Sequence, residues 1–300
     1  MISQEYKKQV GLLLRVLPCV SKEECFALHG GTAINLFVRN MPRLSVDIDL
    51  TYLLIEDRKA ALKNIGDALE RIKNRIGDLL PNVQFLSKSD AGKLLIRADG
   101  KEIKIEVNLV MRGTLSSPKR MTLCNQAQEI YDTSSVIQVV PLGQLYGGKI
   151  CAALNRQHPR DLFDIKLLME NEGFSDATRE GFLLCLICGN GPINEVFAPN
   201  FQDQIQAMEN HFTGMSDIEF TYDDFEETRE QLAETVKKNL TDKDKIFLLS
   251  VKNCDPDWGI YNFERFPAVQ WKLHNLRKFK EEDPDRHKQL YDALKKNLEG

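Results

Sequence analysis

The stretch that decides the fold is HGGTAINLFVRNMPRLSVDIDL, residues 29–50. It ends with two aspartates at alternate positions, Asp47 and Asp49. Because side chains two apart on a β-strand point to the same face, the strand would present two carboxylates side by side while its other face is apolar. Such paired carboxylates repel each other unless a cation or a proton lies between them, and their hard oxygens suit magnesium. The pattern therefore predicts a metal site on a strand.

A glycine turn precedes these aspartates. Gly30-Gly31-Thr32 ends the short apolar stretch 26–28 and opens a helical-looking segment over 33–38. A turn of this kind offers backbone N–H groups to a phosphate. The sequence thus predicts a phosphate site and a metal site within one short segment.

Composition indicates an ordinary globular protein. With 300 residues and 42% hydrophobic content, the chain can form one large domain or two ordinary ones. We expect a cytoplasmic protein, because no apolar run approaches the roughly 20 residues of a membrane span and residues 1–20 read as an amphipathic helix.

The odd number of cysteines, seven, argues against a secreted disulfide framework. Cys185 and Cys188 form a C-x-x-C inside an apolar run, which favours a core role over redox or metal binding.

Charge argues against a protein that coats nucleic acid electrostatically, since the formal net charge is −4. An acidic run covers 217–234, whereas 272–280 and 286–288 are basic. Solvated helix faces explain most such runs. The basic run 272–280 is nevertheless where an RNA partner is expected, if there is one.

Strand-like signals crowd the first half of the chain and helix-like signals fill the second, which predicts an α+β fold. We expect a catalytic domain over 1–140, with a mixed β-sheet flanked by helices, and a helical domain over 141–300 that completes the site. The predicted elements are a covering helix over 56–78, a strand over 136–140, and later helices over 223–240, 242–252, 268–280 and 284–298. Trp271 and Leu273 are expected in the core.

A β-hairpin is predicted over 92–110, with Asp99-Gly100 as its tight turn. In its second strand the polar residues alternate with apolar ones, and Glu106 belongs to the polar face. Glu106 would stand beside Asp47 and Asp49 if the two strands are neighbours. The alternative is that this polar face meets solvent only.

Two helices follow residue 141, and they meet at the break His158-Pro159. The first carries Lys149, and the second carries Asp161 and Asp164, which lie near one another at a spacing of three. From the residues alone these acids could serve the helix dipole or form ordinary salt bridges with Lys149 or Arg160.

Five blocks of sequence together resemble a known family. They are GGTAINLF, PRLSVDIDL, YGGKICAAL, RDLFDIKLL and FPAVQWKLHNLRKF, and they span about Gly30 to Phe279. The chain resembles the AbiEii/AbiGii-type nucleotidyltransferase toxins of the DNA polymerase β-like nucleotidyltransferase superfamily.

The resemblance implies that a nucleoside triphosphate binds with Mg²⁺, or alternatively Mn²⁺, and that its nucleotidyl group passes to an acceptor with release of pyrophosphate. Gly30, Gly31 and Thr32 would hold triphosphate oxygens. Asp47 and Asp49 would bind the metal.

The same resemblance assigns three further groups. Glu106 takes the place of a third carboxylate, as a metal ligand or as the acceptor of a proton from the attacking hydroxyl. Lys149 would neutralise the β- or γ-phosphate. Asp161 matches an acid needed near the nucleotide, with Asp164 in support.

Similar proteins are toxins of toxin–antitoxin or phage abortive-infection systems, which implies a cognate antitoxin and an RNA acceptor, tRNA. Two rival functions remain open. One is a metal-dependent phosphodiesterase or nuclease, since clustered carboxylates with magnesium also serve hydrolysis. The other is a catalytically silent binding protein that keeps the fold.

Overall fold

The computed structural model describes residues 2–189 and 191–299. The chain forms two compact units. The first comprises 1–141 together with 212–219, and the second comprises 142–211 with 220–300. The chain therefore leaves the second unit once, over 212–219, and returns to it.

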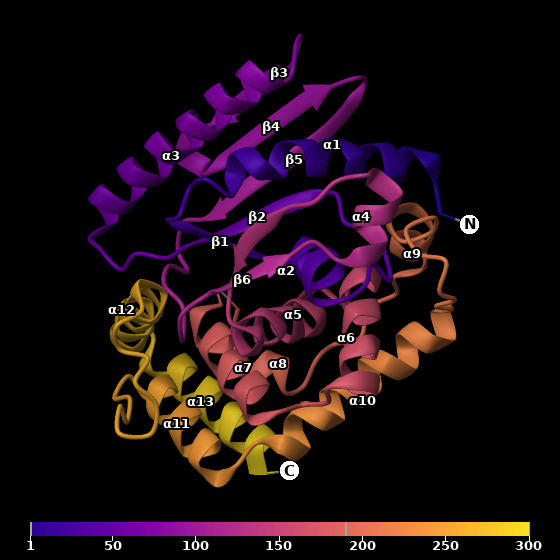
Figure 1. Ribbon diagram of the computed structural model, residues 1–300. Helices are drawn as coiled ribbons and strands as arrows, with labels where there is room; N and C mark the ends of the chain where they lie inside the picture. Colours follow the sequence, from indigo (N-terminus) through magenta and orange to yellow (C-terminus); the bar gives the residue numbers. More distant parts are fainter. Residues whose placement is uncertain (1, 190, 300) are drawn as a thin grey trace. The chain divides into compact units, whose positions relative to one another are not determined.

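The first unit is built on a seven-stranded sheet with the order β3-β4-β5-β2-β1-β7-β6 (Figure 1). Its strands are β1 (Phe26–His29), β2 (Asp47–Tyr52), β3 (Gln84–Lys88), β4 (Lys93–Ala98), β5 (Lys101–Asn108), β6 (Lys119–Thr122) and β7 (Val136–Val139). Its helices are α1 (Gln4–Val20), α2 (Gly30–Ala33), the π-helix η1 (Ile34–Val38), α3 (Arg58–Leu79), the short η2 (Ser89–Ala91) and α4 (Asn125–Tyr131). The sheet is mixed, because β2 runs parallel to β5 and β1 parallel to β7 while the other pairs are antiparallel.

One face of this sheet is apolar and covered. On β5, Ile103, Ile105 and Val107 are buried, and α1 packs against this strand with α3 beside it. The predicted covering helix is α3, in which Ile65 and Ile72 are fully buried. Because side chains alternate along a strand, the residues between the buried ones leave the opposite face of the sheet polar.

The predicted hairpin is confirmed. Strands β4 and β5 are antiparallel with Ala98 opposite Lys101, and Asp99 and Gly100 both have positive φ, 52° and 70°. A type I′ turn requires this left-handed conformation at both central residues.

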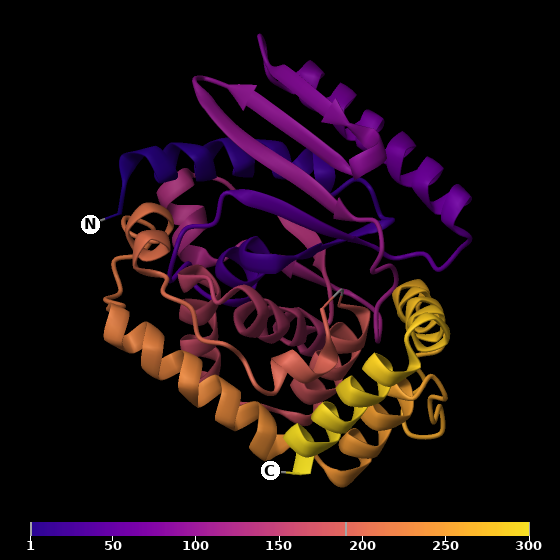
Figure 2. The ribbon, with the colours of Figure 1, turned by 180° about the vertical axis from the view of Figure 1, so that it is seen from behind.

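The second unit is helical (Figure 2). Its helices are α5 (Leu142–Arg156), α6 (Pro159–Asn171), α7 (Asp176–Cys188), α8 (Ile193–Val196), α9 (Ile205–His211), α10 (Tyr222–Asn239), α11 (Asp242–Lys252), α12 (Pro267–Glu282) and α13 (Pro284–Glu299). The last four helices match the predicted segments within two residues at each end. A mixed sheet domain followed by helices confirms the predicted fold class.

Helices α5 and α7 pack backbone against backbone. A Cβ atom at Gly147 would overlap the backbone of Gly181, and a Cβ atom at Gly181 would overlap the carbonyl of Gly143. Small residues four apart let two helix axes approach this closely. This contact fixes the helix that carries Lys149.

One core prediction on α12 is wrong. Leu273 is buried, as predicted, but Trp271 is 56% exposed and stacks on His274 with ring centroids 5.8 Å apart. The buried residues of this helix are Ala268, Val269, Leu273 and Leu276, and Trp271 lies half a turn from Val269.

The core role predicted for the C-x-x-C is confirmed for Cys185, whereas Cys188 is half-buried. Cys185 is buried, and burial raises the pKa of its thiol to about 12, so the thiol stays protonated and inert. Burial also raises the pKa of the Cys188 thiol. Both cysteines are free. No helix in 2–189 or 191–299 is both long and apolar enough to cross a membrane.

Candidate active site

The two aspartates lie on one face of β2, as the alternation predicts. Asp47 and Asp49 are half-buried, whereas Ile48 and Leu50 between and after them are buried. In the parallel register with β5, Asp49 lies opposite Glu106. The neighbouring strands that would bring these three carboxylates together are therefore present.

The glycine turn meets the second aspartate directly. Strand β1 ends at His29, which lies opposite Asp49 in the antiparallel pair with β2. The next residue, Gly30, has φ of +72°, and a Cβ atom built on it would overlap the Asp49 carboxylate and lie 3.2 Å from the Asp49 Cβ atom. Only glycine allows both this backbone conformation and this close approach. The turn and the carboxylate therefore form one site.

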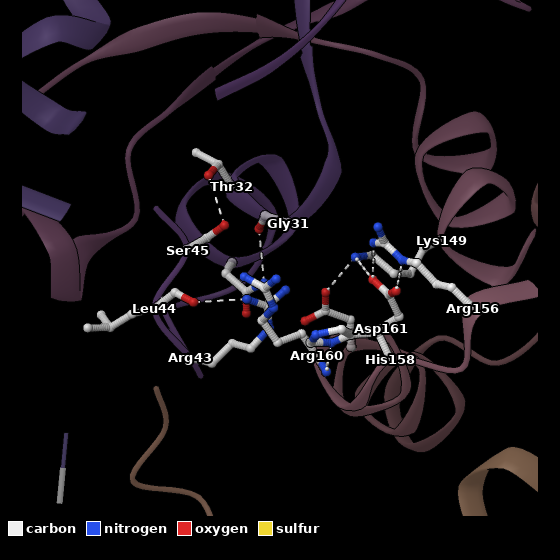
Figure 3. Close-up of polar contacts among 12 residues, drawn as sticks. Gly31, Thr32, Arg43, Leu44, Ser45, Lys149, Arg156, His158, Arg160 and Asp161 are labelled. Carbon is white, nitrogen blue, oxygen red and sulfur yellow. Dashed lines mark hydrogen bonds and ion pairs between the residues drawn. The ribbon is translucent and has the colours of Figure 1, made fainter. Parts of the chain in front are cut away.

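Thr32 anchors the turn from inside. Its side chain is fully buried, and its hydroxyl lies 2.5 Å from the Asp47 carbonyl oxygen and 3.0 Å from Ser45 Oγ (Figure 3). These contacts join the first turn of α2 to the start of β2. With its hydroxyl engaged there, Thr32 fixes the position of the backbone N–H groups of the turn.

Arg43 is a residue of this site that the sequence analysis missed. It is buried beneath the turn, where its Nη1 donates to the Leu44 carbonyl at 2.9 Å (Figure 3). A Cβ atom at Gly31 would lie 2.8 Å from Arg43 Nη2. Its guanidinium thus adds positive charge next to the predicted phosphate cradle. Only its place four residues before Asp47 could have pointed to it.

Glu106 is held by two lysines from its own sheet. Lys93 Nζ lies 3.0 Å from one carboxylate oxygen and Lys104 Nζ lies 2.7 Å from the other. Burial favours the neutral acid, but the hydrogen bonds and charges of the two lysines outweigh it and lower the Glu106 pKa below its usual value. Glu106 is therefore ionised at neutral pH.

Lys104 links all three acids electrostatically. Burial alone would lower its pKa, but Glu106, Asp47 and Asp49 together raise it. A cation therefore already neutralises part of the charge that the three carboxylates bring together. A cavity of about 370 Å³ opens here, lined by His29, Asp49, Leu50, Thr51, Ala91, Glu106, Val107, Asn108, Leu109 and Met111.

The donor set fits a hard cation that takes part of its ligands from a substrate. Among the described residues, no three or more histidines, cysteines and acids are grouped so that they could hold a metal ion by themselves. Asp47 and Asp49 supply two carboxylates on one strand face. Mg²⁺ commonly binds through one or two carboxylates, with phosphate oxygens and water completing its octahedron.

In the second unit, Lys149 joins the two predicted acids. Its Nζ lies 2.9 Å from Asp161 Oδ1 and 3.0 Å from Asp164 Oδ2, and all three residues are at least nine-tenths buried (Figure 3). Arg156, which the sequence analysis missed, adds two hydrogen bonds to Asp161, of 2.5 and 3.0 Å. The salt-bridge alternative for Lys149 is thus confirmed, and any role of these residues toward a nucleotide stays a prediction.

The start of α6 places Asp161. His158 caps this helix by accepting a hydrogen bond from the Arg160 N–H through Nδ1 at 3.1 Å, and Pro159 occupies its first turn. Burial favours protonation of Asp161, but Lys149 and Arg156 outweigh it and hold the Asp161 pKa well below its usual value. Asp161 is therefore a buried carboxylate that is charged at neutral pH.

One comparison with known proteins shows a family, and another shows a similar fold. The family described as "Nucleotidyl transferase AbiEii toxin, Type IV TA system" matches residues 11–275. MenT4, a nucleotidyltransferase toxin from Mycobacterium tuberculosis, is similar in structure, with a TM-score of 0.59 and 13% sequence identity over 91% of this chain and 93% of that chain. At this identity the likeness concerns the fold. No curated protein sequence matches the chain.

Proposed function

Because the chain belongs to the AbiEii family of nucleotidyltransferase toxins of type IV toxin–antitoxin systems, we propose that it transfers a nucleotidyl group from a nucleoside triphosphate to tRNA and releases pyrophosphate. One observation carries the proposal. The Asp49 carboxylate lies against Gly30, so that a carboxylate pair and a turn of backbone N–H groups share one site.

Asp47 and Asp49 would hold Mg²⁺, or Mn²⁺ in its place. When bound, the ion would neutralise charge on the transferred phosphoryl group and on the leaving pyrophosphate. The backbone N–H groups of Gly30 and Gly31 would bind triphosphate oxygens, and Thr32 would keep the turn in register with β2 through its contact with the Asp47 carbonyl.

Glu106 would act through its charge. A base that accepts a proton efficiently has a pKa near the working pH. The two lysines lower the Glu106 pKa, which favours the metal-ligand role over proton acceptance. Lys93 and Lys104 would then position this carboxylate beside Asp49.

Lys149 would neutralise the β- or γ-phosphate. Two buried carboxylates fix its ammonium, so Asp161 and Asp164 would be positioning residues that hold this cation for the nucleotide. Because Lys149 is already held in one conformation, its side chain would lose little further entropy when it binds a phosphate, unlike a mobile lysine on a solvent-exposed helix.

The cellular setting follows from the family. As a toxin of a type IV system, the protein has an antitoxin partner and nucleotide substrates. We propose that it acts in the cytoplasm, where triphosphates and tRNA are present, and that it serves abortive infection.

The direct test incubates the purified chain with total tRNA and each of the four triphosphates, labelled at the α- or the γ-phosphate, with Mg²⁺ and with chelator. Transfer predicts α-label on RNA and γ-label in free pyrophosphate, both abolished by chelator. RNA that is shortened and carries no label would instead support the phosphodiesterase or nuclease alternative.

The silent-binding alternative needs a test in cells. Expression of an Asp47→Asn, Asp49→Asn double variant should no longer inhibit growth. Inhibition equal to that of the parent chain, at equal protein level, would support binding without catalysis.

A further inference from the structure

A cavity of about 300 Å³ in the second unit is lined by residues of α7, α11, α12 and α13. These four helices contact one another (Figure 1). Its lining includes Lys252 at the end of α11 and Trp271, Lys272, Asn275 and Phe279 from α12. None of the described residues that line it is acidic. The volume is at the lower end of ligand pockets, which start at about 300 Å³.

Lys252 is the unusual member of this lining. It is 4% exposed, and among the described residues nothing accepts a hydrogen bond from its Nζ or forms an ion pair with it. Its Nζ lies over the ring of Phe279, 5.8 Å from the ring centroid. Burial lowers the Lys252 pKa. The side chain of Lys252 is mostly buried, and the cavity is the space from which water or an anion reaches its ammonium.

A second ammonium is fixed next to the first. Lys272 Nζ donates to the carbonyls of Gly189 and Gly191 at 2.7 and 2.8 Å, which leaves one of its three N–H groups for a further acceptor. Burial, with the charge of Lys252 as the second cause, lowers the Lys272 pKa to about 8. Lys272 is therefore still mostly charged at neutral pH, and the two cations repel each other until an anion joins them.

The remaining walls suit a planar ring. Trp271 is more than half exposed, although a tryptophan gains from burial, and Phe279 and Leu276 add apolar surface. Bases of single-stranded nucleic acids stack on aromatic side chains of this kind whatever their sequence. Asn275 supplies an amide that can both donate and accept a hydrogen bond.

We propose that this cavity binds one nucleotide of a single-stranded RNA segment, with its phosphate between Lys252 and Lys272 and its base against Trp271. Two ammonium groups in the cavity lining favour an anion, and the phosphodiester of RNA supplies one with two acceptor oxygens. The aromatic walls favour a nucleotide over a bare anion. The proposal rests on the proposed function, because that function supplies an RNA acceptor.

Binding is measured on the full chain, independently of catalysis. The chain has two tryptophans, so Trp258→Phe leaves Trp271 as the only indole reporter. A short single-stranded RNA should quench its fluorescence. Lys252→Met in this background should weaken RNA binding about 10- to 100-fold, the usual effect of losing a charged hydrogen bond. It should also reduce the salt dependence by about one phosphate, 0.7 in the slope of log K against log salt.

Lys295→Met is the matched control. Lys295 lies on α13, outside the cavity lining and outside the basic run 272–280, and its Nζ is paired with Glu299 at 3.8 Å on the surface. Its removal should change RNA binding less than threefold. Lys252→Met replaces a buried charge by an apolar side chain of similar length, so it should unfold at no lower denaturant concentration than the parent chain.

Three results would overturn the proposal: no quenching of Trp271 by RNA, equal loss of affinity in the two lysine variants, or inorganic phosphate that displaces the RNA as well as a nucleoside monophosphate does. Transfer of label to tRNA without Trp271 quenching would remove this site and leave the proposed function intact. Quenching without any transfer would support this site and refute that function.

Discussion

Replacing Gly30 by alanine perturbs the contact on which the active-site geometry depends. The left-handed backbone at this position costs a non-glycine residue about 1–2 kcal/mol in the free energy of unfolding. The added methyl group would also overlap the Asp49 carboxylate, so the carboxylate or the turn has to move. Because a displacement of about 1 Å in a reacting group can cost about 100-fold in rate, we expect transfer to fall about 100-fold in Gly30→Ala.

Gly100→Ala separates these two costs. Gly100 has φ of +70°, close to that of Gly30, but a Cβ atom there would meet nothing within 4 Å. Urea denaturation should show the cost of the left-handed backbone in both variants, whereas a nucleotidyl-transfer assay should show activity within twofold of the parent only in Gly100→Ala. Equal transfer rates in the two variants would refute the contact between turn and carboxylate as a functional feature.

Further predictions concern the second unit. Lys149→Met should lower the free energy of unfolding by about 3–5 kcal/mol, because it removes the ammonium shared by two buried carboxylates; a loss below about 1 kcal/mol in urea denaturation would contradict this. Asp161 has a folded pKa below its ordinary 3.8, so its contribution is present above that pH and is lost as the pH falls through the folded value. Asp161→Asn should therefore cost more stability at pH 7 than at pH 3, and an equal cost at both would contradict the ion pair. Gly181→Ala should cost about 1–3 kcal/mol by forcing α5 and α7 apart. Gly66→Ala, in α3 with nothing within 4 Å of its Cβ position, should stabilise by about 0.5–1 kcal/mol, and a matching loss would disprove the helix-packing argument.

Local periodicity predicted the part of the fold that carries the aspartates. Alternation along β2 and β5 placed Asp47, Asp49 and Glu106 on polar faces, and the Asp99-Gly100 turn fixed the hairpin register. Alternation of this kind predicts strand register well, because a shift by one residue would move every side chain to the wrong face of the sheet.

Partners brought together by tertiary packing could not be predicted in the same way. Nothing in the spacing shows that Arg156, on the far side of a helix break, bonds to Asp161. Lys104 was visible only as one member of an alternating row, and its effect on the carboxylates depends on the strand next to it. The exposure of Trp271 likewise depends on which face of α12 the other helices cover, although propensity favours burying an indole.

The central claim is that the carboxylate pair on β2 supports metal-dependent nucleotidyl transfer. The most direct measurement is the initial rate of pyrophosphate release, together with α-label incorporated into tRNA, as Mg²⁺ is titrated against the parent chain and Asp49→Asn. We expect one pyrophosphate per nucleotide incorporated, saturation with Mg²⁺, and a rate about 100- to 1,000-fold lower in the variant, as for loss of a group that stabilises transition-state charge. A variant that still transfers label within tenfold of the parent rate, or transfer by the parent that is unaffected by chelator, would contradict the account.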